Sequence, residues 1–97
     1  MKNNKDITIS SGLVIIQDNK ILLVHPSNSP WWGTYSIPKG HVDKNENIYD
    51  AAIRETYEET GINIKDFKYS QGESGVINYD DEKGNIYKKV HYFVIYP

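Results

Sequence analysis

The sequence predicts a single mixed α/β domain of the α+β class, in which a β-sheet packs against a helix. Its 97 residues suffice for one domain, 1–97, and leave no room for a second. Runs rich in β-branched residues lie near both ends of the chain, and the segment with helical periodicity lies between them, from Asn47 to Gly61. The predicted order of elements is therefore strand, strand, helix and further strands.

Composition and charge exclude several classes of protein. Hydrophobic residues make up 38% of the chain, and with seven glycines the apolar share is that of a globular domain. The net charge of -2 attracts no phosphate backbone, so we expect no stable nucleic-acid complex. Without cysteine there is no disulfide and no thiolate metal site, and residues 1–6 are polar and contain no signal sequence. We expect a cytoplasmic protein that does not enter a membrane.

The first two predicted strands form a hairpin. Residues 10–16 and 21–25 are β-branched and aliphatic runs, and the four residues between them, Gln17 to Lys20, are turn formers.

A loop with two large aromatic residues follows. Residues 26–33 are mostly loop formers around Trp31 and Trp32, whose rings either line a base pocket or anchor the loop. Residues 35–37 predict a short strand, and Gly40 then allows a turn before the helix.

The predicted helix has signals at both ends. Asn47 and Asp50 resemble a capping box, so the helix begins there, and it runs to about Thr60, where Gly61 stops it.

Extended segments return after the helix. Ile62 and Ile64 begin one such segment, and residues 75–79 pair with 87–96 across a turn at 80–85. The last strand has apolar side chains on both faces, which predicts a position inside the sheet.

One face of the helix changes from apolar to acidic along its length. At about 100° per residue, this face carries Ile48, Ala51, Ala52, Glu55, Glu58 and Glu59, whereas Tyr49, Ile53 and Tyr57 lie elsewhere. The three carboxylates repel one another, and Arg54 supplies only one positive charge. Mg²⁺ or Mn²⁺ would compensate them, because hard cations take carboxylate oxygens, and backbone carbonyls of a turn at 38–41 could join the site. The alternative is a solvated acidic face without a ligand.

The spacing of these residues resembles the Nudix box, the pattern Gly-x5-Glu-x7-Arg-Glu-hydrophobic-x-Glu-Glu-x-Gly-hydrophobic. The positions that match are Gly40, Glu46, Arg54, Glu55, Glu58, Glu59, Gly61 and Ile62. The one departure is Thr56, where the pattern prefers an aliphatic residue, and its methyl group can still pack.

This resemblance implies a Nudix-type α/β/α sandwich around a mixed β-sheet, and a hydrolase that cleaves a nucleoside diphosphate linked to another group. It implies that Glu55, Glu58 and Glu59 are catalytic and hold Mg²⁺ or Mn²⁺, with the Lys39 carbonyl as a further ligand. Glu55 would orient or deprotonate the attacking water.

The remaining residues of the box are implied to support the site. They are Gly40, Glu46, Arg54 and Gly61. Arg54 can hold a glutamate of the box bidentately.

Within the family, the sequence is similar to the diadenosine tetraphosphate hydrolase branch. Residues 35–42 contain its Pro-Lys-Gly-His segment, Tyr79 lies 17 residues after Ile62, where that branch carries a tyrosine, and the strand at 90–93 is also similar. This implies that Lys39, His41 and Tyr79 bind the substrate, with Lys39 on a phosphate and Tyr79 stacked on adenine.

Each of these assignments has a simpler alternative. Tyr79 is otherwise a cross-strand packing residue, and Lys39 is otherwise solvated. His25 and His91 lie in predicted strands, where ordinary packing is the expectation.

The resemblance covers nearly all of this chain, whereas a Nudix domain usually continues further. We therefore expect a domain truncated after the strand that ends near residue 96, present as a monomer or a homodimer. The leading function is a metal-dependent pyrophosphohydrolase of dinucleoside polyphosphates such as diadenosine tetraphosphate. The alternatives are a Nudix hydrolase of nucleoside triphosphates or 5′-triphosphate RNA ends, and a truncated, non-catalytic nucleotide-binding module.

Overall fold

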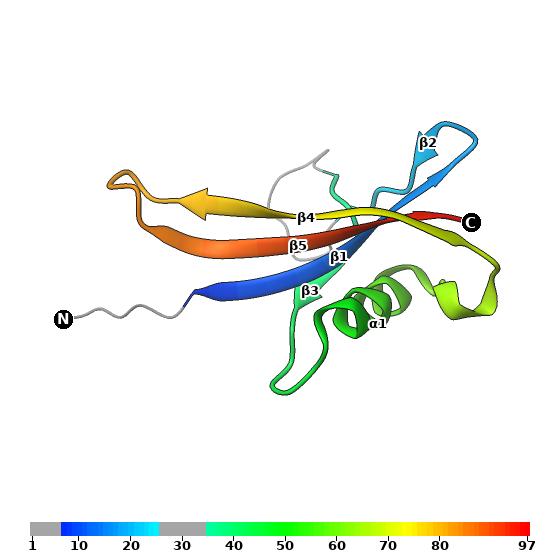
Figure 1. Cartoon of the computed structure of the whole chain (residues 1–97), viewed down its shortest axis with the longest axis horizontal. Helices are drawn as coiled ribbons and strands as arrows, with labels where there is room; N and C mark the ends of the chain where they lie inside the picture. Colours follow the sequence, from blue (N-terminus) through cyan, green and yellow to red (C-terminus); the bar gives the residue numbers. More distant parts are fainter. Residues whose placement is uncertain (1–6, 26–34) are drawn as a thin grey trace.

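The computed structural model describes residues 7–25 and 35–97 (Figure 1). The elements are the strands β1 (Thr8–Gln17), β2 (Lys20–Ile21), β3 (Lys39–His41), β4 (Ser70–Asp80) and β5 (Ile86–Tyr96), the helix α1 (Ile48–Thr60), and the 3-10 helix η1 (Ile64–Asp66). The predicted loop at 26–33, with Trp31 and Trp32, lies outside the described residues.

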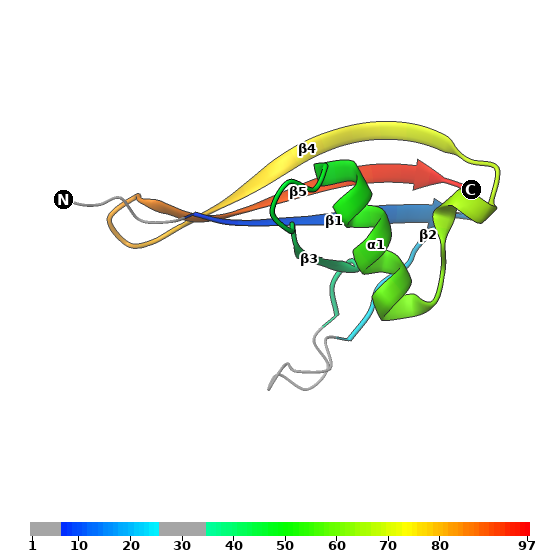
Figure 2. The same cartoon turned by 90° about the horizontal axis from the view of Figure 1, so that it is seen from below.

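The strands form one mixed five-stranded sheet, which confirms the α+β class. The order is β2-β1-β5-β4, and β3 pairs with the same edge of β1 as β2, closer to the start of β1. β1 and β5 are parallel, and the other pairs are antiparallel. β5 lies between β1 and β4, as its two apolar faces predict. Figure 2 shows α1 on one face of the sheet; within the ranges given above, no helix covers the opposite face.

The first hairpin is confirmed, but its second strand is shorter than predicted. Asp18 and Asn19 have φ angles of 54° and 63°, so a two-residue turn of the left-handed kind joins β1 to β2. Beyond Ile21, Val24 makes only an isolated bridge to Ser36. The reason is that β3 occupies the corresponding edge of β1.

The predicted strand at 35–37 and the predicted turn at Gly40 are both wrong. Ser36 takes part only in the isolated bridge, whereas Gly40 lies inside β3, opposite Ser11 of β1. The two strands lie so close together at Gly12 that a Cβ on this residue would overlap the Pro38 carbonyl and lie 2.7 Å from the Cβ of Lys39. Gly12 therefore permits β3 to reach β1.

Both predicted ends of the helix are confirmed. The Asn47 Oδ1 accepts hydrogen bonds from the backbone N–H groups of Tyr49 (2.8 Å) and Asp50 (3.3 Å). Gly61 adopts the left-handed conformation, with φ of 80°, and donates to the Tyr57 carbonyl at 2.8 Å.

The segment after the helix differs from the prediction. Residues 64–66 form η1 rather than an extended segment, because the Asn63 side chain caps this turn and Ile64 is buried in the core with 1% of its surface exposed. The hairpin of β4 and β5 is confirmed, although β4 begins earlier than predicted, at Ser70.

The core lies between α1 and the sheet, and the predicted core face of the helix is partly wrong. The helix contributes Ala52 and Ile53, and the rings of Tyr49 and Phe93 meet edge to face at 5.0 Å between centroids. Ile53 is 7% exposed, so the core face is rotated toward Tyr49 and Ile53 relative to the predicted one. The acidic residues consequently lie beside the core face, not along its centre.

Thr56 is fully buried, and its hydroxyl donates to the Ala52 carbonyl at 2.8 Å, so this departure from the family pattern leaves no polar group unpaired. No helix in the described part of the chain is long and apolar enough to cross a membrane.

The rotated core face can be tested with two truncations in the same helix. We expect Ile53→Ala to lower the free energy of unfolding by about 2–5 kcal/mol, because it leaves a cavity under the helix. Tyr57→Ala should change it by less than about 0.5 kcal/mol, because that side chain is 56% exposed. Urea unfolding measures both, and equally small effects would contradict the packing described here.

Candidate active site

Arg54 connects the helix to the loop that precedes it. Its Nε and Nη2 donate to the Glu46 Oε2 and Oε1 at 2.9 and 3.0 Å, a bidentate pair. Nη2 also donates to the His41 carbonyl at 3.0 Å and lies 3.5 Å from an Asp43 carboxylate oxygen. These hydrogen bonds, with one from the Asp43 backbone, hold the pKa of Glu46 below its usual value. Hydrogen bonds to the carboxylates of Glu46, Glu58 and Glu55 raise the pKa of Arg54.

The third nitrogen of Arg54 reaches the acidic residues of the helix. Nη1 donates to the Oε2 atoms of Glu55 and Glu58 at 3.0 and 3.2 Å. The Glu55 side chain is only 15% exposed, whereas that of Glu58 is 53% exposed. Arg54 thus compensates two of the three clustered carboxylates and leaves Glu59 without this partner.

Glu59 is the carboxylate with an unusual pKa. Burial, and then a hydrogen bond and charge repulsion from Glu55, raise its pKa to about 6; a backbone hydrogen bond and the charge of Lys39 oppose this. Since the opposing contribution of the Lys39 backbone stabilises the charged form, its N–H is the donor. Glu55 and Glu59 are therefore a close acidic pair beside β3.

Gly40 determines how near this pair lies to the sheet. A Cβ on Gly40 would overlap the carboxyl group of Glu55, so the glutamate lies directly on the β3 backbone. Close approach, rather than freedom to turn, is the reason for a glycine at this position.

The acidic pair fits a hard divalent cation, because two neighbouring carboxylates that repel each other provide oxygen ligands and excess negative charge. In the described ranges, no three Asp, Glu, His or Cys residues are already gathered around a single point suited to a metal ion. Glu58 instead turns toward Arg54. Because the Glu58 side chain is 53% exposed, its carboxylate can leave Arg54 with little repacking.

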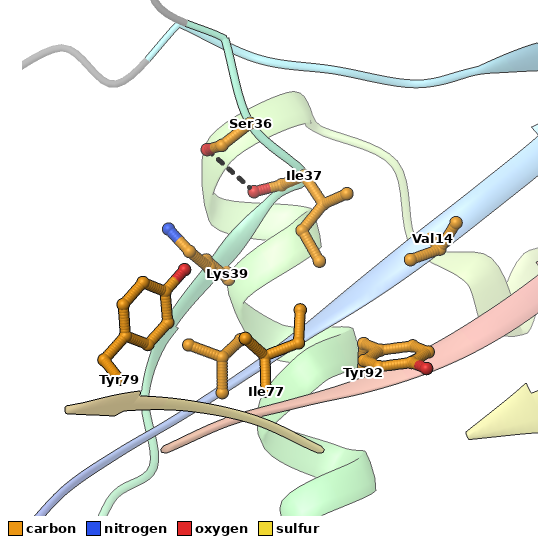
Figure 3. Close-up of a pocket in the computed structure, with 8 residues that line it drawn as sticks. Val14, Ser36, Ile37, Lys39, Ile77, Tyr79 and Tyr92 are labelled. Carbon is orange, nitrogen blue, oxygen red and sulfur yellow. Dashed lines mark hydrogen bonds between the residues drawn. The ribbon is translucent and has the colours of Figure 1, made fainter. Parts of the chain in front are cut away.

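A pocket lies on the other face of the sheet. Its volume is about 330 Å³, and its lining residues come from β1, β3, β4, β5 and the segment before β3: Val14, Ser36, Ile37, Lys39, Ile77, Tyr79, Val90 and Tyr92 (Figure 3). Val90 and Tyr92 alternate along β5 with Phe93 and Ile95 of the core, so the pocket faces away from α1.

Lys39 contributes to both regions, the acidic pair on one side of β3 and the pocket on the other. Its side chain lines the pocket together with Tyr79 (Figure 3). Burial, and then the nearby charge of Lys88, lower the pKa of Lys39, whereas Glu59 raises it. The acidic pair and the pocket are thus adjacent, separated only by a strand of three residues.

The structure gathers most of the predicted site residues. Around the acidic pair it brings together Lys39, Gly40, Glu46, Arg54, Glu55, Glu58 and Glu59. Tyr79 lies across β3 in the pocket, and His41 has an exposed side chain and contributes its carbonyl to Arg54. Gly61 caps the helix instead of lining either region.

The two remaining histidines lie outside these regions. The His25 ring is 5.8 Å from that of Tyr35, and His91 is half-buried in β5.

Sequence reasoning missed residues on the pocket face. The Lys88 Nζ lies 5.6 Å from the centre of the Tyr79 ring, a cation–π contact, and Ile77 and Tyr92 line the pocket. The alternation along the last strand, which places Lys88 and Tyr92 on one face, could have indicated these two residues. It could not indicate which residues of β4 lie beside them, because the register of β4 against β5 is not visible in the sequence pattern.

Two glycine substitutions separate the roles of the strand contacts. Gly12→Ala should destabilise the protein by about 1–3 kcal/mol, because the new methyl group overlaps the Pro38 backbone. Gly40→Ala should cost less than Gly12→Ala, because the group in its way is the end of the Glu55 side chain, which can turn aside, rather than backbone. Thermal unfolding of both variants tests this, and a larger loss for Gly40→Ala would contradict it.

Comparison with known proteins identifies the family of this chain. The NUDIX domain family matches residues 7–97. An ADP-ribose pyrophosphatase of Methanocaldococcus jannaschii is 43% identical over 49 residues, which are 50% of this chain and 29% of that protein. The mouse asymmetrical bis(5'-nucleosyl)-tetraphosphatase is 48% identical over 45 residues, 46% of this chain and 31% of the relative. The matched region is under a third of either relative's length.

A solved structure shows the same arrangement of elements. The binary complex of the Caenorhabditis elegans Ap4A hydrolase superposes with a TM-score of 0.72 at 32% identity. The match covers 93% of this chain and 66% of that one.

Proposed function

The chain belongs to the NUDIX family, and from this we propose that it is a divalent-metal-dependent pyrophosphohydrolase, which cleaves a nucleoside diphosphate linked to another group. The observation that carries the proposal is the acidic pair of Glu55 and Glu59 against the backbone of Gly40. A carboxylate pair held against a bare backbone, with a third carboxylate next to it, is suited to a metal that binds phosphate oxygens.

The residues of the acidic cluster, Glu55, Glu58 and Glu59, and the residues around it have different proposed roles. Glu55, Glu58 and Glu59, with the Lys39 carbonyl, would hold Mg²⁺ or Mn²⁺, which when bound neutralises phosphate oxygens and lowers the pKa of a water. Glu55 would orient or deprotonate the attacking water, since Arg54 donates to its carboxylate and Gly40 leaves space for that carboxylate against β3. Arg54 and Glu46 keep the loop and the helix at a constant spacing.

Dinucleoside polyphosphates such as diadenosine tetraphosphate are the proposed substrates. A base in the pocket would stack on Tyr79, and the Lys39 amino group, which also lines the pocket, would meet the first phosphates. From there the phosphate chain follows the edge of β3 to the acidic pair, past the exposed His41. The mouse and nematode relatives, whose names give this substrate class, support the assignment.

Product analysis tests the function directly. The protein is incubated with diadenosine tetraphosphate and with a panel of nucleoside triphosphates, with and without magnesium, after circular dichroism has established that it is folded. Magnesium-dependent release of ATP and AMP is the expected result. Turnover of the triphosphates alone would favour the alternative substrate class, and no turnover of any anhydride by the folded chain would favour a non-catalytic binding module.

Glu58→Gln tests the acidic cluster. We expect a loss of magnesium-dependent turnover of at least about 100-fold, because the substitution removes one charge from a nearly isosteric side chain. The fold should be unaffected, because Glu58 is exposed. The matched control is Glu73→Gln, an exposed glutamate of β4, which should keep wild-type turnover. Full activity of Glu58→Gln would contradict its assignment to the metal.

Tyr79→Ala tests the substrate class. Loss of a stacking ring should raise KM for diadenosine tetraphosphate roughly 5- to 150-fold, equivalent to about 1–3 kcal/mol, with a smaller effect on a simple triphosphate. Tyr87→Ala is the control, because this exposed tyrosine of β5 does not line the pocket. Steady-state kinetics of both variants decide, and equal effects of Tyr79→Ala on the two substrates would remove the preference for dinucleotides.

A further inference from the structure

The pocket has two distinct ends, and the proposed function uses only one of them. Figure 3 shows Tyr79 and Lys39 at one end and Val14 and Tyr92 at the other, with Ile77 between them. A group that stacks on Tyr79 with its phosphates at Lys39 would extend toward Tyr92. The far end of the pocket therefore meets the part of the base that is most distant from the phosphates.

The position of Tyr92 depends on a glycine in the neighbouring strand. Gly75 of β4 is the register partner of Tyr92. A Cβ on Gly75 would lie 2.5 Å from the Tyr92 hydroxyl oxygen, 2.7 Å from Cζ and 2.9 Å from Cε2, closer than real Cβ atoms come. The Tyr92 ring therefore lies directly against the backbone of β4 at Gly75, a contact that a residue with a Cβ would prevent.

A second pair in the same hairpin repeats this packing outside the pocket. A Cβ on Gly72 would lie 2.6 Å from Cε2 of Tyr96, and neither residue lines the pocket. In both pairs a tyrosine ring lies over a glycine of β4, although Gly75 is the register partner of Tyr92 whereas Gly72 lies in the bulge between Gln71 and Ser74. Because only the first ring bounds the pocket, substitutions in the second pair serve as controls.

We propose that Tyr92, seated on Gly75, sets the length of the pocket and so determines which nucleobases it accepts. The inference rests on the proposed function, because it takes the ligand to be a base. With a side chain at position 75, the ring must lift off β4, and the space on that side of the sheet is the pocket. At about 330 Å³ the pocket is near the lower end of the range for small-molecule sites, roughly 300–1,000 Å³, so it has little room to spare.

Binding of AMP and N6-benzyl-AMP in the presence of magnesium tests the proposal, because neither nucleotide has an anhydride to cleave. Tyr92→Ala should raise the affinity for N6-benzyl-AMP relative to AMP by about 10-fold or more, since it opens the far end of the pocket. Tyr96→Ala, on the same strand, should leave this ratio unchanged. An unchanged ratio in Tyr92→Ala would overturn the proposal.

Substitution of Gly75 should narrow the pocket, whereas Tyr92→Ala opens it. Gly75→Ala should weaken AMP binding by about 10-fold without affecting inhibition of turnover by inorganic tripolyphosphate, which has no base, whereas Gly72→Ala should alter neither. In the double variant Gly75→Ala/Tyr92→Ala the effect of the alanine at position 75 should disappear, because no ring remains to be displaced. An effect that persists there would overturn the mechanism, and where Gly75→Ala does not fold, Tyr92→Ala alone decides.

These measurements separate the two levels of inference. If the wild-type protein binds AMP but the ratios do not change, the role of Tyr92 is wrong and the proposed function stands. If the folded wild-type protein binds neither nucleotide, the base pocket itself is wrong, and this inference falls with it.

Discussion

The guanidinium of Arg54 is the group on which the candidate site depends. It makes five hydrogen bonds, as many as it has N–H donors, to Glu46, Glu55, Glu58 and the His41 carbonyl. These partners come from the end of β3, the following loop and two turns of α1. One rigid planar group thus fixes three segments relative to one another, and a lysine, with three donors on a flexible stem, could not do the same.

The short strand β3 gives the site its two sides. Gly40 faces the helix and receives the carboxylate of Glu55, whereas Lys39, one position earlier, directs its side chain to the pocket on the opposite face. The absence of a Cβ on Gly12 allows the strand to lie this close to β1. Charge chemistry and base recognition are therefore coupled through three residues, and a shift of β3 would move both.

The sequence was sufficient to predict the elements with local signals. Asn47 and Gly61 marked the ends of the helix, and the turn formers at Asp18 and Asn19 marked the first hairpin, because capping and turn chemistry act within a few residues. The class of the fold and the grouping of the three helix glutamates followed from spacing in the same way.

Features that depend on tertiary contact were not predictable. Gly40 was interpreted as a turn, since its contact with Glu55 arises only when helix and strand meet. The core face of the helix differs from the predicted one because Tyr49 packs edge to face against Phe93, a residue more than 40 positions away. The pocket remained unseen for the same reason, since the register of β4 on β5 brings its walls together.

The distribution of charge around the helix explains why this region differs from the rest of the fold. Arg54 pairs with the carboxylates of Glu46, Glu55 and Glu58, whereas Glu59 makes its hydrogen bond to Glu55 instead. A protein selected for stability alone would place an apolar residue there, since the pair costs free energy at neutral pH. The contacts of Glu55 with Arg54 and Gly40 keep its carboxylate next to Glu59, so the repulsion between the two glutamates persists in the free protein. A bound cation would offset this repulsion.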